Sequence, residues 1–473
     1  MVRPVAGPVK PVSRFGEYNG PWMRWLLICA IMAGPMADAR ALAGGGKDGW
    51  NLPAQGDLKG WRNFLAGHLQ KDVLGFWLKY GPDKEYGGFH GQINRMGKPE
   101  PAAEKSLVLE SRIVWTFAAA YRQFPREEYR KAAKDAFDFM EQHLWDKEYG
   151  GWFWSVSRSG GMLDGKKHLY GQTFAIYAMA EYYRAFGDKK ALDRSMEDFG
   201  LMEKHAHDQK YGGYLEPFTR EWKPDTGENP IGPNDQKSTN THMHLMEAFS
   251  NLLRACDGVA SGAGAAVAGR ASLAVGGGKL VRERLEEVYG IILDKVTGPE
   301  GYAREFFKQD WTPIPSPDTS YGHEVEEAWL LLDAADALGR PKEEKCAKLA
   351  KALVDRPMKY GYDAVGGGLY ERGPVAGPPT VKSKTWWVEA ECMVGLLAVY
   401  DLTRDRVYLD SFDRLTRWIL NTLADREYGE WFQGVFEDGK IDMAWKVTPW
   451  KCPYHNSRAL LESVRRLDLI TGK

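Results

Sequence analysis

Two histidines that could act as acids, bases or metal ligands stand two positions apart in the segment NTHMHLMEA, which begins at Asn240. On a helix with 3.6 residues per turn, side chains two positions apart point roughly 200° apart. His242 and His244 can therefore share a metal ion only if the helix has not yet begun. We expect one ring to face a pocket and the other to pack in the core, and helix geometry alone does not say which.

A histidine and a glutamate lie three positions apart in SYGHEVEEAW, where Gly322 ends a loop and His323 begins a predicted helix. Residues i and i+3 share one helix face, so His323 and Glu326 can interact. A carboxylate beside an imidazole fixes its tautomer and raises its pKa towards neutral, which suits a general acid or base. The alternative is a glutamate that stands near a helix start because the macrodipole favours negative charge there.

Two further segments combine aromatic rings with polar side chains. In KTWWVEAE, Trp387 and Glu391 are four positions apart, so an indole ring and a carboxylate share a helix face. In PWKCPYHNSRALLE, Pro453 fixes the approach to the final predicted helix, His455 opens that helix, and Trp450 precedes it. An aromatic ring for stacking, next to a side chain that accepts a hydrogen bond from a sugar hydroxyl, is typical of sugar sites. Adjacent tryptophans and helix entries are otherwise ordinary structural features.

An internal repeat indicates how these segments are brought together. An Asp/Glu/Gln-x-Tyr-Gly-Gly turn followed by aromatic residues recurs, with a weaker copy, PEGYAREFF, from Pro299. Three copies are spaced 63 and 62 residues apart, and two others 63. Paired glycines supply the positive φ of a tight turn, and the aromatics after them indicate a short strand. The clear copies start at Lys84, Lys147, Gln209, Asp363 and Arg426.

Paired helical patterns fill the intervals between these turns. One member of a pair is apolar nearly all round, as an inner helix should be, and its partner has a charged face. Six hairpins of about 62 residues can close into a ring, so we predict an all-α (α/α)6 barrel with short β-hairpin turns at one end. An open solenoid is the alternative, but it would require capping repeats. The predicted helices are 59–79, 104–124, 130–144, 168–186, 190–205, 240–256, 280–294, 323–338, 342–357, 385–403, 407–422 and 455–468.

The candidate residues stand at or near the starts of the predicted inner helices. Helix starts on one side of a ring converge on one end of its central pocket, so we expect these side chains to meet there. They are Arg112, Tyr170, His244, His323 with Glu326, Trp387 with Glu391, and His455.

Composition narrows the kind of ligand. The net charge of the 473-residue chain is −1 and no run of five like charges occurs, so nucleic-acid binding by a basic face has no support. The chain contains 18 Trp, 22 Tyr and 19 Phe. Aromatic faces stack on the C–H bonds of sugar rings, although most of these residues are expected in the core.

The N-terminal region is typical of an export signal. The stretch WLLICAIMAGPMA, from Trp25 to Ala37, is apolar, follows an arginine and is too short to span a bilayer. We predict that residues 1–43 are a signal peptide or N-terminal extension of a periplasmic or secreted protein, with no membrane segment after signal removal. A poorly packed N-terminal arm is the alternative.

The rest of the chain, residues 50–473, is predicted to form one catalytic domain. A Gly/Ala/Ser-rich segment at about 256–279 lengthens the fourth repeat and is typical of a flexible insertion. The cysteines after the signal region show no C-x-x-C spacing, and no disulfide pairing is predicted from them, although disulfides are possible.

Together the motifs resemble those of one family, the cellobiose 2-epimerases within the wider N-acylglucosamine 2-epimerase superfamily. NTHMH resembles the family's Asn-Thr-His-Leu-His, and YGHEVE resembles Tyr-Gly-His-Asp-Ile-Glu. KTWWVEAE resembles Trp-Trp-x-Gln-x-Glu, and WKCPYHNSR resembles Trp-Lys-x-Pro-Tyr-His-Asn-x-Arg. Arg112 in SRIVWTFA resembles an early family arginine. The resemblance covers about residues 55–470 and implies the (α/α)6 fold independently of the repeat.

The resemblance implies a sugar epimerase that acts on a small carbohydrate and requires neither a nucleotide nor a metal. We expect the protein to be a monomer or homodimer. It implies that His323 and His455 exchange the proton at C2 of the opened sugar and that His244 assists ring opening. It also implies that Arg112 holds the enediolate oxygen, that Glu326 orients His323, and that Trp387, Glu391, Trp450, Asn240 and Tyr170 bind the sugar.

The chain departs from the family pattern at three places. Glu389 stands where the family has Gln, the loop before Asn240 is shorter, and the Gly/Ala/Ser-rich insertion is extra. These departures bear on the identity of the substrate more than on the reaction.

Three other functions remain open from the sequence. An aldose–ketose isomerase would use the same enediolate and differ in where the proton returns. A glycoside hydrolase would use two carboxylates ~5–9.5 Å apart, and a zinc hydrolase would use several histidines. The candidates are Glu326, Glu389, Glu391 and Asp235 for the glycosidase, and His242, His244, His323 and Glu326 for the zinc enzyme.

Overall fold

The computed structural model describes residues 37–38, 50–227, 236–260, 271–298, 301–341 and 343–472, with the side chains of 37–38, 259–260 and 271–276 left out. Apart from Ala37 and Asp38, the predicted signal segment lies outside the described residues. Asp235 and residues 261–270, the centre of the predicted insertion, also lie outside them.

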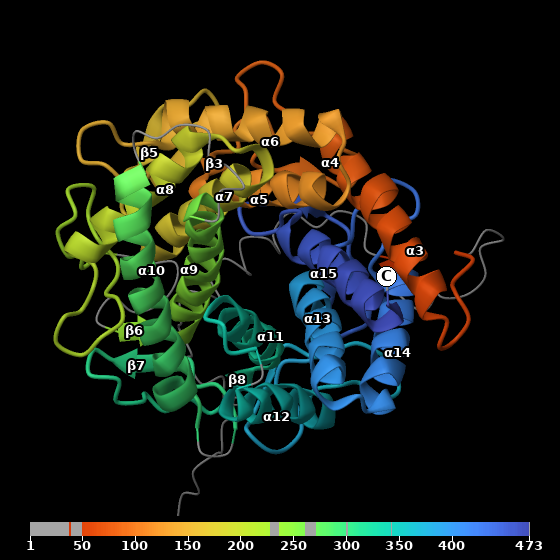
Figure 1. Cartoon of the computed structure of the whole chain (residues 1–473). Helices are drawn as coiled ribbons and strands as arrows, with labels where there is room; N and C mark the ends of the chain where they lie inside the picture. Colours follow the sequence, from red (N-terminus) through yellow and green to blue (C-terminus); the bar gives the residue numbers. More distant parts are fainter. Residues whose placement is uncertain are drawn as a thin grey trace, which may run out of the picture. The chain divides into compact units, whose positions relative to one another are not determined.

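The described helices form two concentric layers, which confirms the predicted double-walled ring (Figure 1). Each inner helix packs between two other inner helices, and an outer helix packs behind it. The inner helices are α5 (Leu107–Gln123), α7 (Leu169–Phe186), α9 (Thr239–Ala260), α11 (Tyr321–Ala337), α13 (Trp386–Thr403) and α15 (Tyr454–Thr471). The outer helices are α3 (Leu58–His68), α4 (Leu74–Tyr80), α6 (Glu127–Phe139), α8 (Lys189–His205), α10 (Ala271–Ile291), α12 (Glu344–Tyr360) and α14 (Arg406–Thr422).

Three outer helices contain or end in a wider π-helical turn that periodicity did not predict. These turns are η1 (Leu69–Val73), which joins α3 to α4, η2 (Met140–Leu144) after α6, and η3 (Ile292–Val296) after α10.

The two layers differ in burial because they differ in side-chain pattern. Every residue from Leu169 to Tyr182 of α7 is buried, as an inner helix requires when protein surrounds it. The buried residues of the outer helix α14 instead gather on one face, which packs against α13. The inner wall therefore provides a rigid frame on which polar side chains of the first helical turns can be placed.

One hairpin of the ring is assembled from the two ends of the domain. The first described helix, α3, packs against the last, α15, and α15 also packs against α5. An ion pair completes the closure: Arg95 donates to both carboxylate oxygens of Asp425, at 2.7 and 3.1 Å. The same contact occurs between neighbouring repeats, where Arg158 binds Asp83 and Arg220 binds Asp146.

The repeated turn is stabilised by a buried ion pair. In five copies an aspartate three residues before the Tyr-Gly-Gly position binds a lysine that precedes an inner helix. Lys237 Nζ, for example, lies 2.6 Å from Asp208. The other pairs are Lys105–Asp83, Lys167–Asp146, Lys384–Asp363 and Lys446–Asp425.

Short antiparallel strands form small sheets where the chain enters the inner helices, as predicted for one end of the ring. The sheet orders are β1-β12-β11-β10, β13-β2, β3-β4-β5, β6-β7 and β8-β9. The strands are β1 (Ala37–Asp38), β2 (Ile93–Asn94), β3 (Lys105–Ser106), β4 (Ser155–Val156), β5 (Met162–Asp164), β6 (Gln236–Ser238), β7 (Phe306–Lys308), β8 (Thr319–Ser320), β9 (Arg372–Gly373), β10 (Lys384–Thr385), β11 (Gly434–Val435), β12 (Lys440–Asp442) and β13 (Trp445–Val447).

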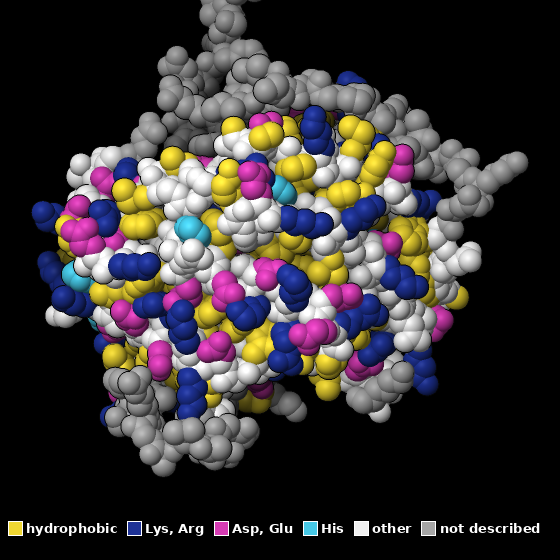
Figure 2. All heavy atoms as spheres, turned by 90° about the horizontal axis from the view of Figure 1, so that it is seen from above, with side chains coloured by type: hydrophobic (Ala, Val, Ile, Leu, Met, Phe, Trp, Pro, Cys, Tyr) yellow, Lys and Arg dark blue, Asp and Glu magenta, His cyan; other side chains and the backbone are white. Residues whose placement is uncertain are grey.

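Helices α9 and α10 extend into both ends of the predicted insertion. Two of its glycines serve helix packing, because a Cβ at Gly277 would collide with Met196 of α8 and one at Gly278 would press on Cys256 of α9. No helix within the described residues is both long and apolar enough to cross a bilayer. On the face seen in Figure 2, acidic and basic side chains are interspersed, in line with the near-zero net charge.

Candidate active site

The predicted site residues occupy equivalent positions on the inner helices. Tyr170, Trp387 and His455 are the second residues of α7, α13 and α15. The sixth residue points into the ring on four helices, and a rise of about 1.5 Å per residue places all four at the same depth. These sixth residues are Arg112 of α5, His244 of α9, Glu326 of α11 and Glu391 of α13.

His455 is held by a carboxylate from the neighbouring inner helix. Its Nδ1 lies 2.7 Å from Glu391 Oε1, and Trp329 Nε1 donates to the other oxygen of Glu391 at 3.0 Å. His455 as a whole residue is only 6% exposed. Burial, followed by the charges of Arg112 and Arg458, lowers the pKa of His455 well below its ordinary value. The ring is therefore neutral at pH 7, and its Nε2 is free to take a proton.

His244 has the same kind of support from its own helix. Its Nδ1 lies 2.9 Å from Glu247 Oε2, and its ring packs edge-on against Tyr170, with 5.3 Å between ring centroids. Glu247 Oε1 and Oε2 also accept the hydroxyl of Tyr454, at 2.6 and 2.7 Å. Burial opposes ionisation of Glu247, but Arg458, His244 and Tyr454 lower its pKa to about 2.

His242 is the histidine that packs away from the centre. Its Nδ1 lies 2.8 Å from the Ser238 carbonyl oxygen, and its Nε2 accepts the Tyr214 backbone N–H at 3.0 Å. Both ring nitrogens are thus bound by backbone groups. This pairing fixes His244, and not His242, as the member of the NTHMH motif that faces the centre.

His323 is half-buried and packs against Trp387, with ring centroids 5.0 Å apart. The ring centroids of Trp387 and His455 are 5.9 Å apart, so the indole is adjacent to both imidazoles. Burial, Arg372 and His244 lower the pKa of His323 to about 3. Among the described residues no side chain hydrogen-bonds its ring nitrogens, and Glu326 is not its partner.

Arg112 faces the same space from α5. Its Nη2 donates to the Tyr170 hydroxyl at 2.9 Å, and its guanidinium lies 4.2 Å from the Phe174 ring centroid. Burial raises the pKa of Tyr170 to about 12, so the hydroxyl stays protonated. Arg112 Nη1 reaches the Trp450 carbonyl oxygen at 3.5 Å, which connects it to the loop before α15.

Half-buried aromatic and polar side chains surround these groups. Trp450 lies with its ring centroid 6.1 Å from Tyr170 and 6.2 Å from Trp154. Trp154 was not predicted as a site residue, although it follows one of the repeated Gly-Gly turns. Asn240 is half-buried, and its Oδ1 has no hydrogen-bond partner in the described part of the chain.

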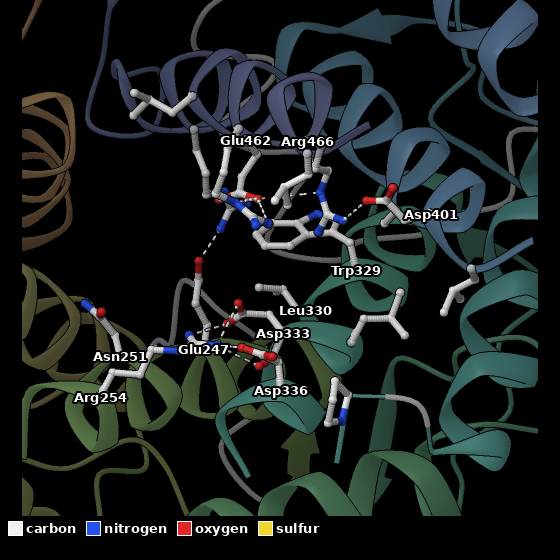
Figure 3. Close-up of a pocket in the computed structure, with 18 of the residues that line it drawn as sticks. Glu247, Asn251, Arg254, Trp329, Leu330, Asp333, Asp336, Asp401, Glu462 and Arg466 are labelled. Carbon is white, nitrogen blue, oxygen red and sulfur yellow. Dashed lines mark hydrogen bonds and ion pairs between the residues drawn. The ribbon is translucent and has the colours of Figure 1, made fainter. Parts of the chain in front are cut away.

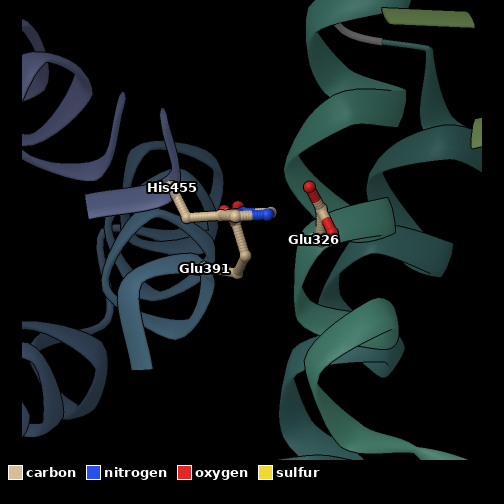
Figure 4. Close-up of side chains that lie close together, drawn as sticks. All are labelled: Glu326, Glu391 and His455. Atoms are coloured by element: carbon tan, nitrogen blue, oxygen red, sulfur yellow. The ribbon is translucent and has the colours of Figure 1, made fainter. Parts of the chain in front are cut away.

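Glu326, Glu391 and His455 come close enough to suggest a metal site, since one ligand atom of each lies within 4.8 Å of the others (Figure 4). A guanidinium, however, already supplies the positive charge there. Arg458 Nη2 donates to Glu326 Oε1 at 2.5 Å and to Glu391 Oε1 at 2.7 Å. The cluster is therefore an ion-pair network. The zinc hypothesis also needs His242 as a ligand, but backbone groups bind both nitrogens of that ring.

The contacts of the glutamates do not support the glycosidase hypothesis either. Glu389 accepts the Leu369 backbone N–H with its two carboxylate oxygens, at 2.9 and 3.1 Å. Gln172 does the same for Trp152, and both are the fourth residue of an inner helix. The departure from the family's Gln therefore affects a turn rather than the site. Glu326 and Glu391 share one guanidinium nitrogen, an arrangement unsuited to carboxylates that must flank a glycosidic bond.

A cavity of about 1400 Å³ lies at the opposite end of the inner helices (Figure 3). It is lined by later turns of the same helices, and its charged residues are paired with one another: Arg254 binds Asp333 and Arg466 binds Asp401. Two of its lining residues, Glu247 and Arg458, also belong to the histidine site, because Glu247 binds His244 and Arg458 binds Glu391, the partner of His455. The cavity contains none of the three predicted catalytic histidines.

Sequence reasoning missed Glu247 as a partner of His244 and did not assign a role to Arg458. The signal was present, because Glu247 follows His244 by three positions and Arg458 follows His455 by three. That is the spacing used to link His323 with Glu326.

Known proteins share both the sequence and the fold. The sequence model of the N-acylglucosamine 2-epimerase family matches residues 87–256 and 269–459. A cellobiose 2-epimerase of Bacteroides fragilis is 33% identical over 411 residues, 84% of this chain and 98% of that protein. A D-mannose isomerase of Marinomonas mediterranea is 25% identical over 416 residues, 86% of this chain and 98% of that protein. The structure of cellobiose 2-epimerase from Spirochaeta thermophila has a TM-score of 0.76 and 34% identity, covering 89% of this chain and all of that one. With its ring of inner helices, its convergent histidines and these matches, the chain belongs to the N-acylglucosamine 2-epimerase family of carbohydrate epimerases.

Proposed function

We propose that this protein is a cellobiose-type 2-epimerase, which interconverts glucose- and mannose-type units at the reducing end of a sugar. The observation that carries the proposal is the placement of His244, His323 and His455 on three inner helices around one space. The Nδ1 atoms of His244 and His455 are each held by a glutamate. The identity to a cellobiose 2-epimerase, 33% against 25% for a mannose isomerase, favours this substrate class.

The reaction requires a sugar ring to open, the C2 proton to leave and a proton to return to the other face. The intermediate is an enediolate, which needs stabilising positive charge and bases that are neutral at the working pH. His323 and His455 meet that need because burial keeps both rings neutral. One neutral ring takes the C2 proton and becomes imidazolium. The other ring, once it has taken up a proton from solvent, delivers that proton to the opposite face of the enediolate and returns to its neutral form.

His244 and Arg112 have supporting roles in this scheme. The Nδ1 of His244 is held by Glu247, so its Nε2 is available to move a proton between the ring oxygen and the O1 hydroxyl. Arg112 carries a permanent charge next to the Tyr170 hydroxyl, and it stabilises the enediolate oxygen.

Glu326 has a different role from that implied by family resemblance. It binds Arg458 and lies near His455, and it does not orient His323. Burial and the neighbouring Glu391 raise the pKa of Glu326 to about 7. A carboxyl group that titrates near neutral pH can donate a hydrogen bond to a sugar oxygen or accept one, as ring opening and closure require.

Aromatic and polar side chains would hold the sugar. The exposed parts of Trp387 and Trp450 offer ring faces for stacking, and the unpartnered Oδ1 of Asn240 can accept a sugar hydroxyl. Glu391 acts through His455 and is not itself a sugar ligand in this scheme.

Aldose–ketose isomerisation is the second candidate, because it shares the enediolate and differs only in returning the proton to C1. A decisive experiment incubates the protein with cellobiose, mannose, glucose and N-acetylglucosamine in D2O and locates deuterium by NMR. We expect 4-O-glucosyl-mannose from cellobiose, with label at C2. A ketose product labelled at C1 would support the isomerase, and release of free monosaccharide from cellobiose would support a hydrolase. No conversion of any sugar would contradict all three.

We also propose that the protein is exported, because an arginine-led apolar stretch ends in small residues near position 43. Fractionation of the source cells and N-terminal sequencing of the mature protein test this. An intact N-terminus in the cytoplasmic fraction would contradict export.

A further inference from the structure

Arg458 joins three inner helices through a single guanidinium group. Its Nη1 donates to Glu247 Oε1 of α9 and to the Tyr454 hydroxyl. Its Nη2 donates to Glu326 of α11 at 2.5 Å and to Glu391 of α13 at 2.7 Å. Arg458 as a whole residue is 1% exposed, and its guanidinium lies 4.7 Å from the Trp329 ring centroid. One cation thus binds three carboxylates in a layer directly behind the histidines.

Two of these carboxylates also bind catalytic-site histidines. Glu247 holds Nδ1 of His244 at 2.9 Å, and Glu391 holds Nδ1 of His455 at 2.7 Å. An ionised carboxylate can only accept a hydrogen bond, so each imidazole must carry its proton on Nδ1. That tautomer leaves the lone pair of Nε2 free for chemistry.

Burial opposes the ionisation of these two glutamates. Burial raises the pKa of Glu391, and the charge and hydrogen bond of Arg458 oppose the rise. Burial would also raise the pKa of Glu247, but Arg458 reverses that effect and is the largest influence lowering it. Among the described residues, other charged or titratable groups facing this layer include Arg112 from α5, Tyr170 and Tyr177 from α7, His323 and Glu326 from α11, and Tyr454 from α15.

We propose that Arg458 is a positioning residue that fixes the tautomers of His244 and His455 together, by keeping Glu247 and Glu391 ionised in a buried layer. Without the guanidinium, the buried glutamates would take up protons near neutral pH. A protonated glutamate donates its O–H to Nδ1, which moves the imidazole proton to Nε2 and removes the lone pair that should face the sugar. The inference rests on the proposed function, since it concerns the histidines assigned there.

The test uses Arg458→Met in the full chain and reads the tautomers directly. In the unmodified protein, ¹⁵N–¹H long-range NMR should show His244 and His455 as the Nδ1–H tautomer at pH 7, with signals assigned from His244→Gln and His455→Gln. In Arg458→Met both should change to the Nε2–H tautomer. This measurement needs no substrate, so it can fail or succeed independently of the epimerase proposal.

The kinetic arm measures kcat for cellobiose epimerisation between pH 6 and 9. Misoriented or wrongly protonated histidines should lower kcat about 10–100-fold at pH 7. Part of the loss should be recovered towards pH 9, where the glutamates ionise again. A kcat that falls equally at every pH, with both tautomers unchanged, would overturn the proposal.

A second variant, Arg458→Lys, keeps the test informative if Arg458→Met does not fold. Arg458→Lys retains the charge, but one ammonium cannot span Glu247 and Glu391 as the two-armed guanidinium does. We expect at least one of the two histidines to change tautomer, with an alkaline shift of the kcat profile. A wild-type tautomer pattern and pH profile in Arg458→Lys would overturn the proposal.

The matched control is Arg466→Met, which removes another buried arginine of α15. Arg466 pairs with Asp401 in the cavity at the far end of the ring. This variant should lose stability but keep both tautomers and the pH profile of kcat. If it changes the tautomers as Arg458→Met does, the effect is general to loss of a buried charge and the proposal is wrong.

Discussion

His455 Nδ1 and Glu391 Oε1 lie 2.7 Å apart, which joins the second residue of the last inner helix to the sixth residue of the helix before it. The imidazole is held by a hydrogen bond to a residue of another helix. Its position depends on ring closure as much as on the local sequence. The same geometry leaves Nε2 as the only ring nitrogen that can meet a substrate.

Replacing either proposed acid–base histidine should remove most turnover. We expect His323→Ala and His455→Ala each to lower kcat by ~10²–10⁴, because a general acid or base typically contributes that much. Circular dichroism should show an unchanged helical content. Near-native turnover by either variant, measured with cellobiose, would contradict its assignment.

His242→Gln provides the corresponding structural control. In α7 a glutamine, Gln172, already binds a turn N–H from the fourth helical position, so Gln can replace His242 there. We expect kcat within a few-fold of the unmodified protein. A loss comparable to that of His455→Ala would place His242 in the catalytic machinery after all.

The same variant should alter the pH dependence of stability. Burial lowers the pKa of His242 from 6.5 to about 4. Below pH 6.5 the unfolded chain takes up a proton that the folded chain refuses, so stability falls as the pH drops from about 6.5 to about 4. This group should contribute about 3 kcal/mol to that fall, at about 1.4 kcal/mol per pKa unit. Urea denaturation of His242→Gln should show a correspondingly flatter profile.

Glu389→Gln should stabilise the protein in alkaline solution. Burial raises the pKa of Glu389 from 4.5 to about 8, so the folded chain holds a proton that the unfolded chain releases. Stability is therefore lost as the pH rises from about 4.5 to about 8, and an uncharged glutamine avoids the loss. We expect a gain of up to a few kcal/mol at pH 8, little change at pH 4.5 and unaltered kcat. A large fall in kcat would instead place Glu389 in the sugar site.

Arg95→Ala should weaken the closure of the ring. Arg95 makes a two-armed contact with the buried carboxylate of Asp425, which would keep only Lys446 as its charged partner. We expect a loss of about 1–3 kcal/mol in the free energy of unfolding, as for other hydrogen bonds to charged groups. Arg426→Ala, which removes an exposed arginine of the same turn, should change it by less than about 0.5 kcal/mol. Equal effects of the two variants would show that the Arg95 contact has no special role.

Much of the fold was predictable because a ring of amphipathic hairpins carries its pattern in every repeat. The 3.6-residue period located the helices, and the apolar character of segments such as Leu169–Tyr182 separated the inner layer from the outer one. The π-helical turns were not predictable, since one additional residue in a turn leaves the hydrophobic pattern almost unchanged. The buried Lys–Asp pairs recur at the spacing of the repeat, so a comparison of aligned copies would have found them.

The site was predictable as a set of residues but not as a set of contacts. Helix spacing shows which side chains share a face, and it correctly separated His242 from His244. It wrongly paired Glu326 with His323, because spacing carries no information about partners on other helices. Glu326 accepts a charged hydrogen bond from Arg458, which stands on another inner helix. Such a bond is stronger than one to the neutral His323 ring on its own helix.

The hairpin shared by α3 and α15 has a consequence for biosynthesis. Whether it leaves the ribosome or an export channel, the chain emerges N-terminus first, so helices α5 to α14 can pack against their neighbours before α15 arrives. The face of α3 that packs against α15 stays uncovered until that last eighteen-residue helix arrives. That helix also brings His455 and Arg458. Catalytic competence and protection of the apolar face of α3 from aggregation are therefore acquired in the same final step of folding.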